Sequence, residues 1–336
     1  MANVNLNLYS RYQRVGIIDD PEGEEIFDDH STYGSFSEMC DATGQWTPKV
    51  GEGLYLPFLA VIRCEAKEKG ITGTDAELSA KVNPWPESQT TGDCVSHFVR
   101  NACDVARAID IEHEGDHERW DTRTATEPTY GHRGHRGAGA NCSRLVDYVR
   151  SVGGMLLRKP YDIDGYGKLD LSRYNASIGI KWGGGGVPDS VKAECKKHRI
   201  TDAIRVKTKD DILQAYRQGH AVGGCSSLGL SRVRNEDGVS RAKGSWAHAM
   251  HSHGLDERDE TVKKYGSPLV LIQNSWGAWN SGPRKIRGTD ILIPRGSCWF
   301  PLDSYIRYYS GSCFCLKEAD GWKALKPVTV GFSAFG

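Results

Sequence analysis

Four stretches of the chain place apolar residues at helical spacing. The clearest starts at Cys94, after which apolar residues recur at steps of three and four, as on a helix with one buried face. These residues are Val95, Phe98, Ala102, Val105 and Ile109. The other three predicted helices cover 54–69, 141–152 and 208–218. Asn141 and Thr208 stand where their side chains can cap the first turn of the last two.

A different pattern begins after Ala221, where short apolar and alternating segments are separated by glycine and charged turns. The predicted strands cover 221–228, 245–254, 268–276, 289–293, 296–300 and 310–316. Helices first and strands later predict an α+β fold with two lobes and a cleft between them. We place a helical lobe at about 51–160 and a β-rich lobe at about 200–336, which together form one domain over 51–336.

Two segments outside these elements have less regular patterns. Residues 161–188, with four consecutive glycines at 183–186, predict an irregular crossover. A phosphate-binding loop is the weaker alternative there, because no lysine and serine or threonine follow in P-loop spacing. Residues 1–50 are acidic between Asp19 and Asp29 and predict a solvated extension. An inhibitory or tethering segment is the alternative.

Composition and charge exclude several classes of function. Lysine and arginine together number 43, as do aspartate and glutamate, so no net field favours nucleic acid or a membrane as partner. No apolar run approaches the roughly 18 residues of a membrane span, and no apolar signal segment follows Met1. The ten cysteines include no C-x-x-C pair. Mostly free thiols in a reducing, cytoplasmic compartment are expected, and an exported disulfide protein is the alternative.

Cys94 is the first candidate for chemistry. It stands where a polar loop, SQTTGDC, enters the predicted helix. Unpaired N–H groups and the positive end of the helix dipole favour a thiolate at that place. Most such cysteines are only structural, so reactive chemistry needs partners elsewhere in the chain.

A second candidate is HEGDH, over 113–117, because H-E-x-x-H on a helix is the zinc-protease pattern. Gly115 and Asp116 separate the two histidines where a buried metal helix would prefer apolar residues. No third ligand is evident downstream. We therefore expect a solvated helix end and no metal or other cofactor.

Two predicted strands carry partners for Cys94. His248 lies among small and apolar residues, where a histidine alone is more often a satisfied core residue. The next strand ends in Q-N-S-W-G, which places Asn274 at a strand end. An amide oxygen can accept from one imidazole nitrogen and fix the tautomer, while the other nitrogen takes the thiol proton.

These residues resemble the papain-like cysteine proteases, in which histidine and asparagine follow the nucleophile by roughly 130 to 150 residues. Here His248 follows Cys94 by 154 residues and Asn274 by 180. The resemblance covers about 83–316, and Q-N-S-W-G is its most specific part. G-D-C-V-S, W-x-H-A-M and Q-N-S-W-G together look like divergent members of the family from bacteriophages and bacteria.

The resemblance implies a role for each residue. Cys94 would be the nucleophile, His248 the general base and later acid, and Asn274 the group that orients the imidazole. Trp276 would shield that hydrogen bond, and Gln89 would donate to the oxyanion together with the Cys94 N–H. The substrate-binding glycines of the family fall in the glycine-rich segment around Gly137 to Asn141, which makes Gly137, Gly139 and Asn141 the implied substrate-binding residues.

Departures from the family pattern concentrate in the cysteine loop. The usual Q-G-x-C-G-x-C-W has its glutamine where this chain has Ser88, one place before Gln89. Thr91 replaces a disulfide cysteine, and Val95 replaces the tryptophan after the nucleophile. Asp93 can cap the helix, but its charge disfavours a thiolate.

The expected function is cysteine-type peptide hydrolysis through a thioester, with a peptide or protein as substrate. The alternative is a catalytically silent papain fold in a structural or interaction protein, since a fold does not fix a function. In that case the protein would be virion-associated or associate with itself.

Overall fold

The fold was analysed in a computed structural model that describes residues 17–50, 52–113, 119–152, 155–198, 200, 202–309, 312–317 and 328. The helices of these ranges are α2 (Pro21–Asp29), α3 (Phe36–Thr43), α4 (Phe58–Glu68), α5 (Asp75–Lys81), α6 (Cys94–His113), α7 (Glu127–Gly131), α8 (Cys142–Asp147), α9 (Ala176–Gly185), α10 (Asp189–Cys195), α11 (Lys209–Arg217), α12 (Asp259–Tyr265) and α13 (Leu302–Tyr309). A π-helical turn, Tyr148–Val152, continues α8, and a 3-10 turn, Lys196–His198, follows α10.

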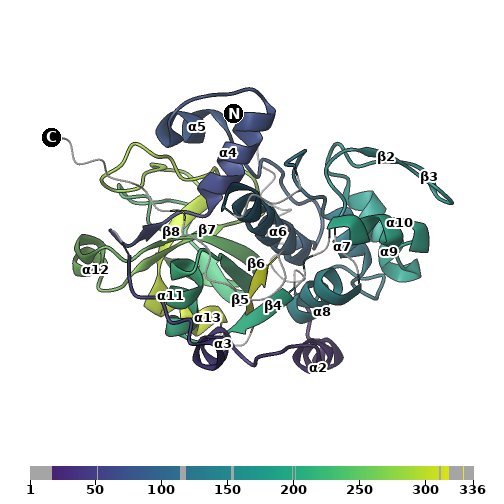
Figure 1. Ribbon diagram of the computed structural model, residues 1–336, viewed down its shortest axis with the longest axis horizontal. Helices are drawn as coiled ribbons and strands as arrows, with labels where there is room; N and C mark the ends of the chain where they lie inside the picture. The colour runs from purple at the N-terminus through teal and green to yellow at the C-terminus, as the bar shows by residue number, and fades with distance from the viewer. Residues whose placement is uncertain are drawn as a thin grey trace.

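One antiparallel sheet organises the β-rich part of the chain (Figure 1). Its strands are β1 (Leu54–Tyr55), β4 (Asp202–Val206), β5 (Val222–Leu230), β6 (Ala242–Asp256), β7 (Leu269–Gln273), β8 (Ser297–Pro301) and β9 (Cys313–Lys317). They are ordered β4-β9-β5-β6-β7-β8, and β1 pairs with the far end of β6. A separate hairpin joins β2 (Pro160–Ile163) to β3 (Gly167–Asp170).

Side-chain alternation divides the core between the two faces of the sheet. In β7, Val270 and Ile272 belong to one buried cluster, together with side chains of α3, α11 and α13. Leu269 and Leu271 belong to another, together with α4 and the C-terminal half of α6. Phe314 of β9 packs in a third cluster with the first half of α6 and with α8. The long helix α6 therefore lies on one face of the sheet with α4 and α8, and α3, α11 and α13 lie on the other.

The predicted helices exist, with shifted ends. The five apolar residues predicted on α6 are all buried: Val95, Phe98, Ala102, Val105 and Ile109. Asn141 caps α8 by accepting from the Arg144 N–H, and Thr208 forms a capping box with Asp211. The helix predicted from residue 54 starts at Phe58, because the preceding residues pair with β6 as β1.

Two predicted segments differ from the structure. The crossover at 161–188 contains the β2–β3 hairpin and α9, and the glycine run closes that helix, with Gly186 at φ 83°. Burial of Trp182 against Leu156 and Val191 explains why this satellite core forms despite its glycines. The strand predicted at 289–293 is only an isolated bridge between Lys285 and Leu292. The other five predicted strands are present.

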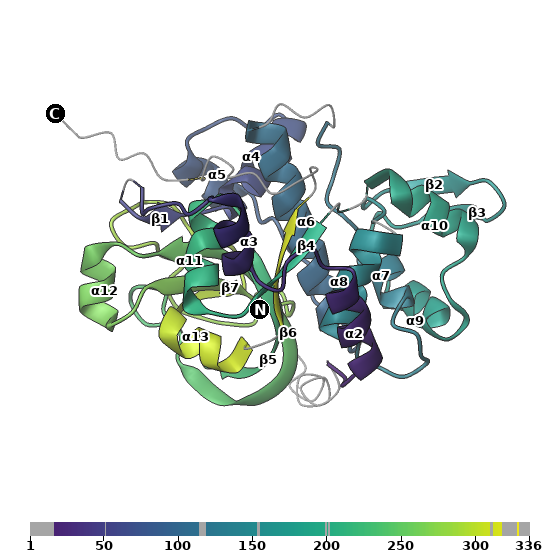
Figure 2. The same ribbon diagram turned by 60° about the horizontal axis from the view of Figure 1, so that its bottom comes forward.

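The acidic segment expected to be solvated instead packs on the helical part of the chain, where α2 lies beside α8 (Figure 2). Phe27 is fully buried between Arg150 and Arg205, which lie over its ring. Glu24 accepts hydrogen bonds from Asn141 Nδ2 (3.0 Å), Ser143 Oγ (2.7 Å) and Arg205 (2.7 Å). The boundary placed near residue 50 stays a prediction, and residues 1–16 lie outside the described ranges.

Candidate active site

Cys94 is the first residue of α6, as the sequence predicts. Its side chain is fully buried, and its Sγ accepts the backbone N–H of Ala249 at 3.4 Å. Burial raises the pKa of the thiol to about 12, the Ala249 hydrogen bond lowers it, and the Asp93 charge raises it further. The helix terminus alone therefore does not produce a thiolate here, because desolvation is the larger effect.

His248 and Asn274 are brought together by the pairing of β6 with β7. His248 Nε2 lies 2.9 Å from Asn274 Oδ1. Because an amide oxygen only accepts, Nε2 carries the proton and Nδ1 is left as an acceptor. Nδ1 is buried and has no hydrogen-bond partner among the described residues. Burial lowers the pKa of this imidazole to about 4, although the Asn274 bond raises it.

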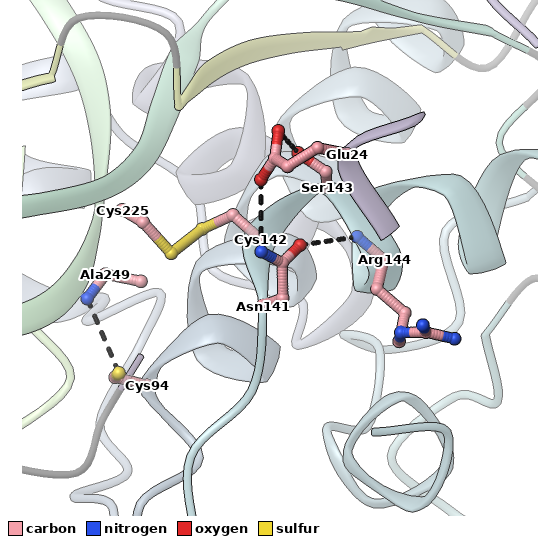
Figure 3. The surroundings of a disulfide bond; sticks show 8 residues. All are labelled: Glu24, Cys94, Asn141, Cys142, Ser143, Arg144, Cys225 and Ala249. Carbon is pink, nitrogen blue, oxygen red and sulfur yellow. Dashed lines mark hydrogen bonds between the residues drawn. A yellow bond between two sulfur atoms is a disulfide. The ribbon is translucent and has the colours of Figure 1, made fainter. Parts of the chain in front are cut away.

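The connection between these residues and Cys94 runs through Ala249. Ala249 follows His248 directly, and its N–H reaches the Cys94 sulfur (Figure 3). The start of α6 therefore contacts the backbone of β6 at the residue that follows His248. With one nitrogen taken by Asn274, His248 Nδ1 is the nitrogen available to a thiol proton.

Trp276 lies over His248, with ring centroids 4.6 Å apart and the planes inclined by 31°. Trp246 and Trp279 pack against Trp276 in turn. Trp276 thus packs against the imidazole within a cluster of indole rings. That it shields the His248–Asn274 hydrogen bond, as the resemblance implies, stays a prediction.

Gln89 is held in the cysteine loop by a different arrangement from the one that the family pattern implies. Its Nε2 donates to the carbonyl oxygen of Thr91 at 2.8 Å, and its Oε1 accepts from the Ser275 hydroxyl. The Gln89 backbone N–H also donates to Ser275 O at 2.8 Å. The loop that carries Cys94 is thus tied to the loop that carries Asn274, and one amide hydrogen of Gln89 is already used.

One of the three residues that match the family's substrate-binding positions, Gly139, is bonded to the cysteine loop. The Gly139 N–H donates to Gly92 O at 3.1 Å, and its φ of 88° suits glycine. Asn141 is 7% exposed and already bonded to Glu24 and the Arg144 N–H. The carbonyl oxygen of Gly137 accepts from Arg133 instead.

The sequence did not identify Tyr174 as a neighbour of this loop. Its hydroxyl donates to Asp93 Oδ2 at 2.7 Å and accepts the Thr90 N–H at 3.1 Å. His97 Nε2 lies 3.6 Å from the same Asp93 oxygen. Tyr174 comes from the segment interpreted as irregular, and no local signal connects it with a loop some eighty residues earlier.

A disulfide joins the two lobes beside this site (Figure 3). Cys142 begins α8 and Cys225 lies on β5, opposite Ala249 in the ladder. The other eight cysteines form no disulfide. The expectation of mostly free thiols therefore agrees with eight of the ten cysteines and not with this pair. The helical pattern around Cys142 and the strand pattern around Cys225 are local, so neither indicates that the two residues meet.

Nothing in the described ranges suggests a metal centre. No group of three or more histidine, cysteine, aspartate or glutamate side chains there could hold an ion. The HEGDH segment cannot be compared with its prediction, since 114–118 lie outside the described residues and α6 ends at His113. None of the described helices combines the length and the apolar character needed to cross a membrane.

Among solved structures, the chain is similar to xylellain, a cysteine protease from Xylella fastidiosa. The TM-score is 0.51 at 14% sequence identity, and the match covers 91% of this chain and 96% of xylellain. It also matches procathepsin B S9 from Trypanosoma congolense, with a TM-score of 0.45, 9% identity and coverages of 94% and 89%. No protein-family model matches the chain, and no curated protein sequence does. The likeness to xylellain shows that this chain has the papain-like fold.

Proposed function

We propose that the protein is a papain-like cysteine peptidase that hydrolyses peptide bonds with Cys94, His248 and Asn274. The observation that carries this proposal is the 2.9 Å contact between His248 Nε2 and Asn274 Oδ1. It leaves Nδ1 as the open acceptor in a histidine whose chain neighbour, Ala249, is bonded to the Cys94 sulfur. These two contacts support the proposal that Cys94, His248 and Asn274 act as nucleophile, base and orienting amide in acyl transfer.

In the proposed reaction, His248 Nδ1 takes the thiol proton and the Cys94 sulfur attacks the carbonyl carbon. The negative charge on the carbonyl oxygen would be stabilised by the backbone N–H of Cys94 and by the remaining amide hydrogen of Gln89. The C–N bond then breaks, and His248 returns the proton to the leaving amine. Water, deprotonated by His248, next attacks the thioester carbon, which releases the acid and the thiol.

The site described is a closed one. Cys94 and His248 have no exposed surface, and burial keeps them as a neutral thiol and a neutral imidazole at pH 7. A substrate can reach the sulfur only if the walls around it separate. Contact with water and substrate would lower the pKa of the thiol, because desolvation is the largest cause of its elevation.

This same burial favours a second candidate function. A papain fold that serves as a structural or interaction protein, including a component of a virus particle, has no need to expose Cys94. Hydrolysis separates the two proposals, since the second predicts none.

The test measures hydrolysis of an internally quenched peptide library by the wild-type chain in the presence of a thiol reductant. We expect Cys94→Ala to abolish hydrolysis, whereas Cys195→Ala, which removes another buried thiol in a different core cluster, should retain it. Equal hydrolysis by the wild-type chain and Cys94→Ala would refute the peptidase mechanism. No hydrolysis by the wild-type chain would favour the structural role.

A further inference from the structure

A cationic cavity of ≈ 340 Å³ lies between the end of α5 and the loops that follow β7. Its lining is Ala80, Lys81, Val82, Asn83, Pro86, Ala278, Arg284 and Arg295. Three of these side chains are cations and none is an acid. The cavity therefore has one sign of charge on its walls, which concentrates anions in a cleft of low dielectric.

The three cations lack a close carboxylate partner in the described part of the chain, and Glu77, an exposed acid one turn before Lys81, interacts with Lys81 only through its charge. Among the described residues, no ion pair within 4 Å joins Lys81, Arg284 or Arg295 to an acid. Arg284 donates only to backbone carbonyls, from Nε to Ile293 O (2.7 Å) and from Nη2 to Ser79 O (3.4 Å). Arg234, the next cation, likewise bonds to neutral oxygens of Asn280, Ser297 and Gly282.

Lys81 and Arg295 are exposed and Arg284 is half-buried, so it is the charge of Arg284 that lies partly away from water without a close acid. Burial and the charges of Arg295 and Arg234 lower the pKa of Arg284 to about 10. Uncompensated buried charge is unfavourable, and a bound anion would relieve both the repulsion and the desolvation. Asn83, whose Oδ1 accepts the Arg295 N–H, leaves its amide hydrogens as further donors at the rim.

The cavity adjoins the proposed active site along two paired segments. Ser88 bridges to Trp276, and the Gln89 N–H donates to Ser275 O. Pro86 is two residues before Ser88, Ala278 is two residues after Trp276, and both line the cavity. Pro86 is three residues from Gln89, so the cavity wall begins at most about 11 Å from that residue.

The position of the cavity indicates which half of a bound peptide would approach it. In the proposed reaction His248 protonates the leaving amine, and Trp276 covers His248. Ala278, which lines the cavity, is two residues from Trp276, whereas the disulfide is next to Ala249 through the pairing of Cys225 with that residue. A peptide segment that leaves with the amine would pass toward the cavity.

We propose that the cavity of Lys81, Arg284 and Arg295 binds a carboxylate of the substrate segment that follows the scissile bond. This proposal rests on the peptidase function, but binding of a carboxylate there does not. The carboxylate is either an acidic side chain or the C-terminal group of a short peptide, which share the same recognition chemistry. Arginine forks and a lysine supply the donors that carboxylates accept.

The first experiment needs no catalysis. Lys81 acetylation by an amine-reactive acetyl ester is measured by peptide mass spectrometry in the full chain, with succinate at about 10 mM or chloride at equal ionic strength. We expect succinate to slow acetylation of Lys81 several-fold and not that of Lys168, an exposed lysine on the distant hairpin. Arg295→Gln should remove the protection. Equal acetylation in both salts would refute an anion site, whatever the activity.

The second experiment places the carboxylate on the substrate. Three quenched peptides share one sequence and carry, after the scissile bond, aspartate with an amidated end, asparagine with an amidated end, or asparagine with a free carboxylate. We expect at least one acidic peptide to exceed the neutral one about tenfold in kcat/KM, and Lys81→Gln with Arg295→Gln to bring that ratio near one. A wild-type ratio of one would show that the site takes only free anions and refute the substrate role.

Discussion

At the scale of single residues, the site depends on buried polar groups whose partners come from distant segments. Asp93 precedes Cys94 and is 1% exposed, and among the described residues its Oδ2 contacts the Tyr174 hydroxyl and the His97 ring, with the charge of Arg133 acting on it as well. Its Oδ1 has no hydrogen-bond partner in the described part of the chain. The shape of the cysteine loop therefore depends strongly on Tyr174, which also accepts the Thr90 N–H.

We expect Tyr174→Phe to lower the free energy of unfolding by about 1.5–3 kcal/mol, since it removes a part-buried hydrogen bond to a carboxylate. Urea titration followed by circular dichroism measures the change. Tyr166→Phe is the matched control, because the Tyr166 ring packs on Trp182 in the satellite cluster without a described hydroxyl partner. A loss for Tyr174→Phe no larger than that of the control would contradict the account.

At the scale of elements, the two lobes are fastened together next to the nucleophile. The Cys142–Cys225 disulfide closes a sequence separation of 83 residues and joins α8 to β5. Cys142, Cys225, Ala249 and Cys94 share one buried cluster. Movement of α8 away from the sheet, which would expose Cys94, is therefore opposed by a covalent bond.

We expect Cys142→Ala with Cys225→Ala to lower the free energy of unfolding by up to about 4–5 kcal/mol, the chain-entropy value for a loop of this length. In the same variant, Cys94 should be carboxymethylated faster by iodoacetate under non-reducing conditions, because the walls of the site can then separate. Cys195→Ala with Cys298→Ala, two buried thiols without a disulfide, serves as the control. Unchanged labelling of Cys94 would show that the disulfide does not limit access.

Two buried histidines of strand β6, His251 and His253, make the stability of the fold depend on pH. Both rings are fully buried and lie 5.7 Å apart. Burial lowers the pKa of His253 to about 3, and burial, His253 and Arg100 hold that of His251 well below 6.5. The folded chain therefore keeps both rings neutral where the unfolded chain, with ordinary values near 6.5, protonates them.

Because the unfolded chain binds more protons, the free energy of unfolding should fall as the pH drops below about 6.5 toward 4. Each ring contributes up to about 1.4 kcal/mol per pH unit in that range. Urea unfolding at pH 7.5, 6.0 and 5.0 measures this dependence. His251→Phe should reduce the slope of the free energy of unfolding against pH by the contribution of one imidazole ring. The same stability at all three pH values would contradict the account.

At the scale of the whole molecule, the sequence predicts the α+β class, α6 with its buried face and five of six strands beyond residue 221. Periodicity is a local property, so these elements can be predicted from the sequence. The sequence also supplied Cys94, His248 and Asn274, because each had an unusual local context. Contacts between distant segments cannot be predicted from local patterns. The Cys142–Cys225 bond, the Tyr174–Asp93 bond and the docking of α2 all join residues more than eighty positions apart.

The fold places the proposed chemistry where helix meets sheet. α6 crosses one face of the sheet and presents Cys94 at its start, and β6 and β7 present His248 and Asn274 from the sheet itself. Docked α2 and the cross-lobe disulfide close this junction on the side of α8. The proposed peptidase activity consequently requires both these three residues and a motion that opens the site.

The central claim is that Cys94 is a nucleophile activated by His248. Its most direct measurement is peptide mapping by mass spectrometry after incubation of the reduced chain with a peptide-based electrophile. The account predicts one adduct, on Cys94, whose rate of formation falls at least about a hundredfold in His248→Ala and is unchanged in Cys195→Ala. An adduct that forms equally fast in His248→Ala, or that appears on other cysteines ahead of Cys94, would contradict it.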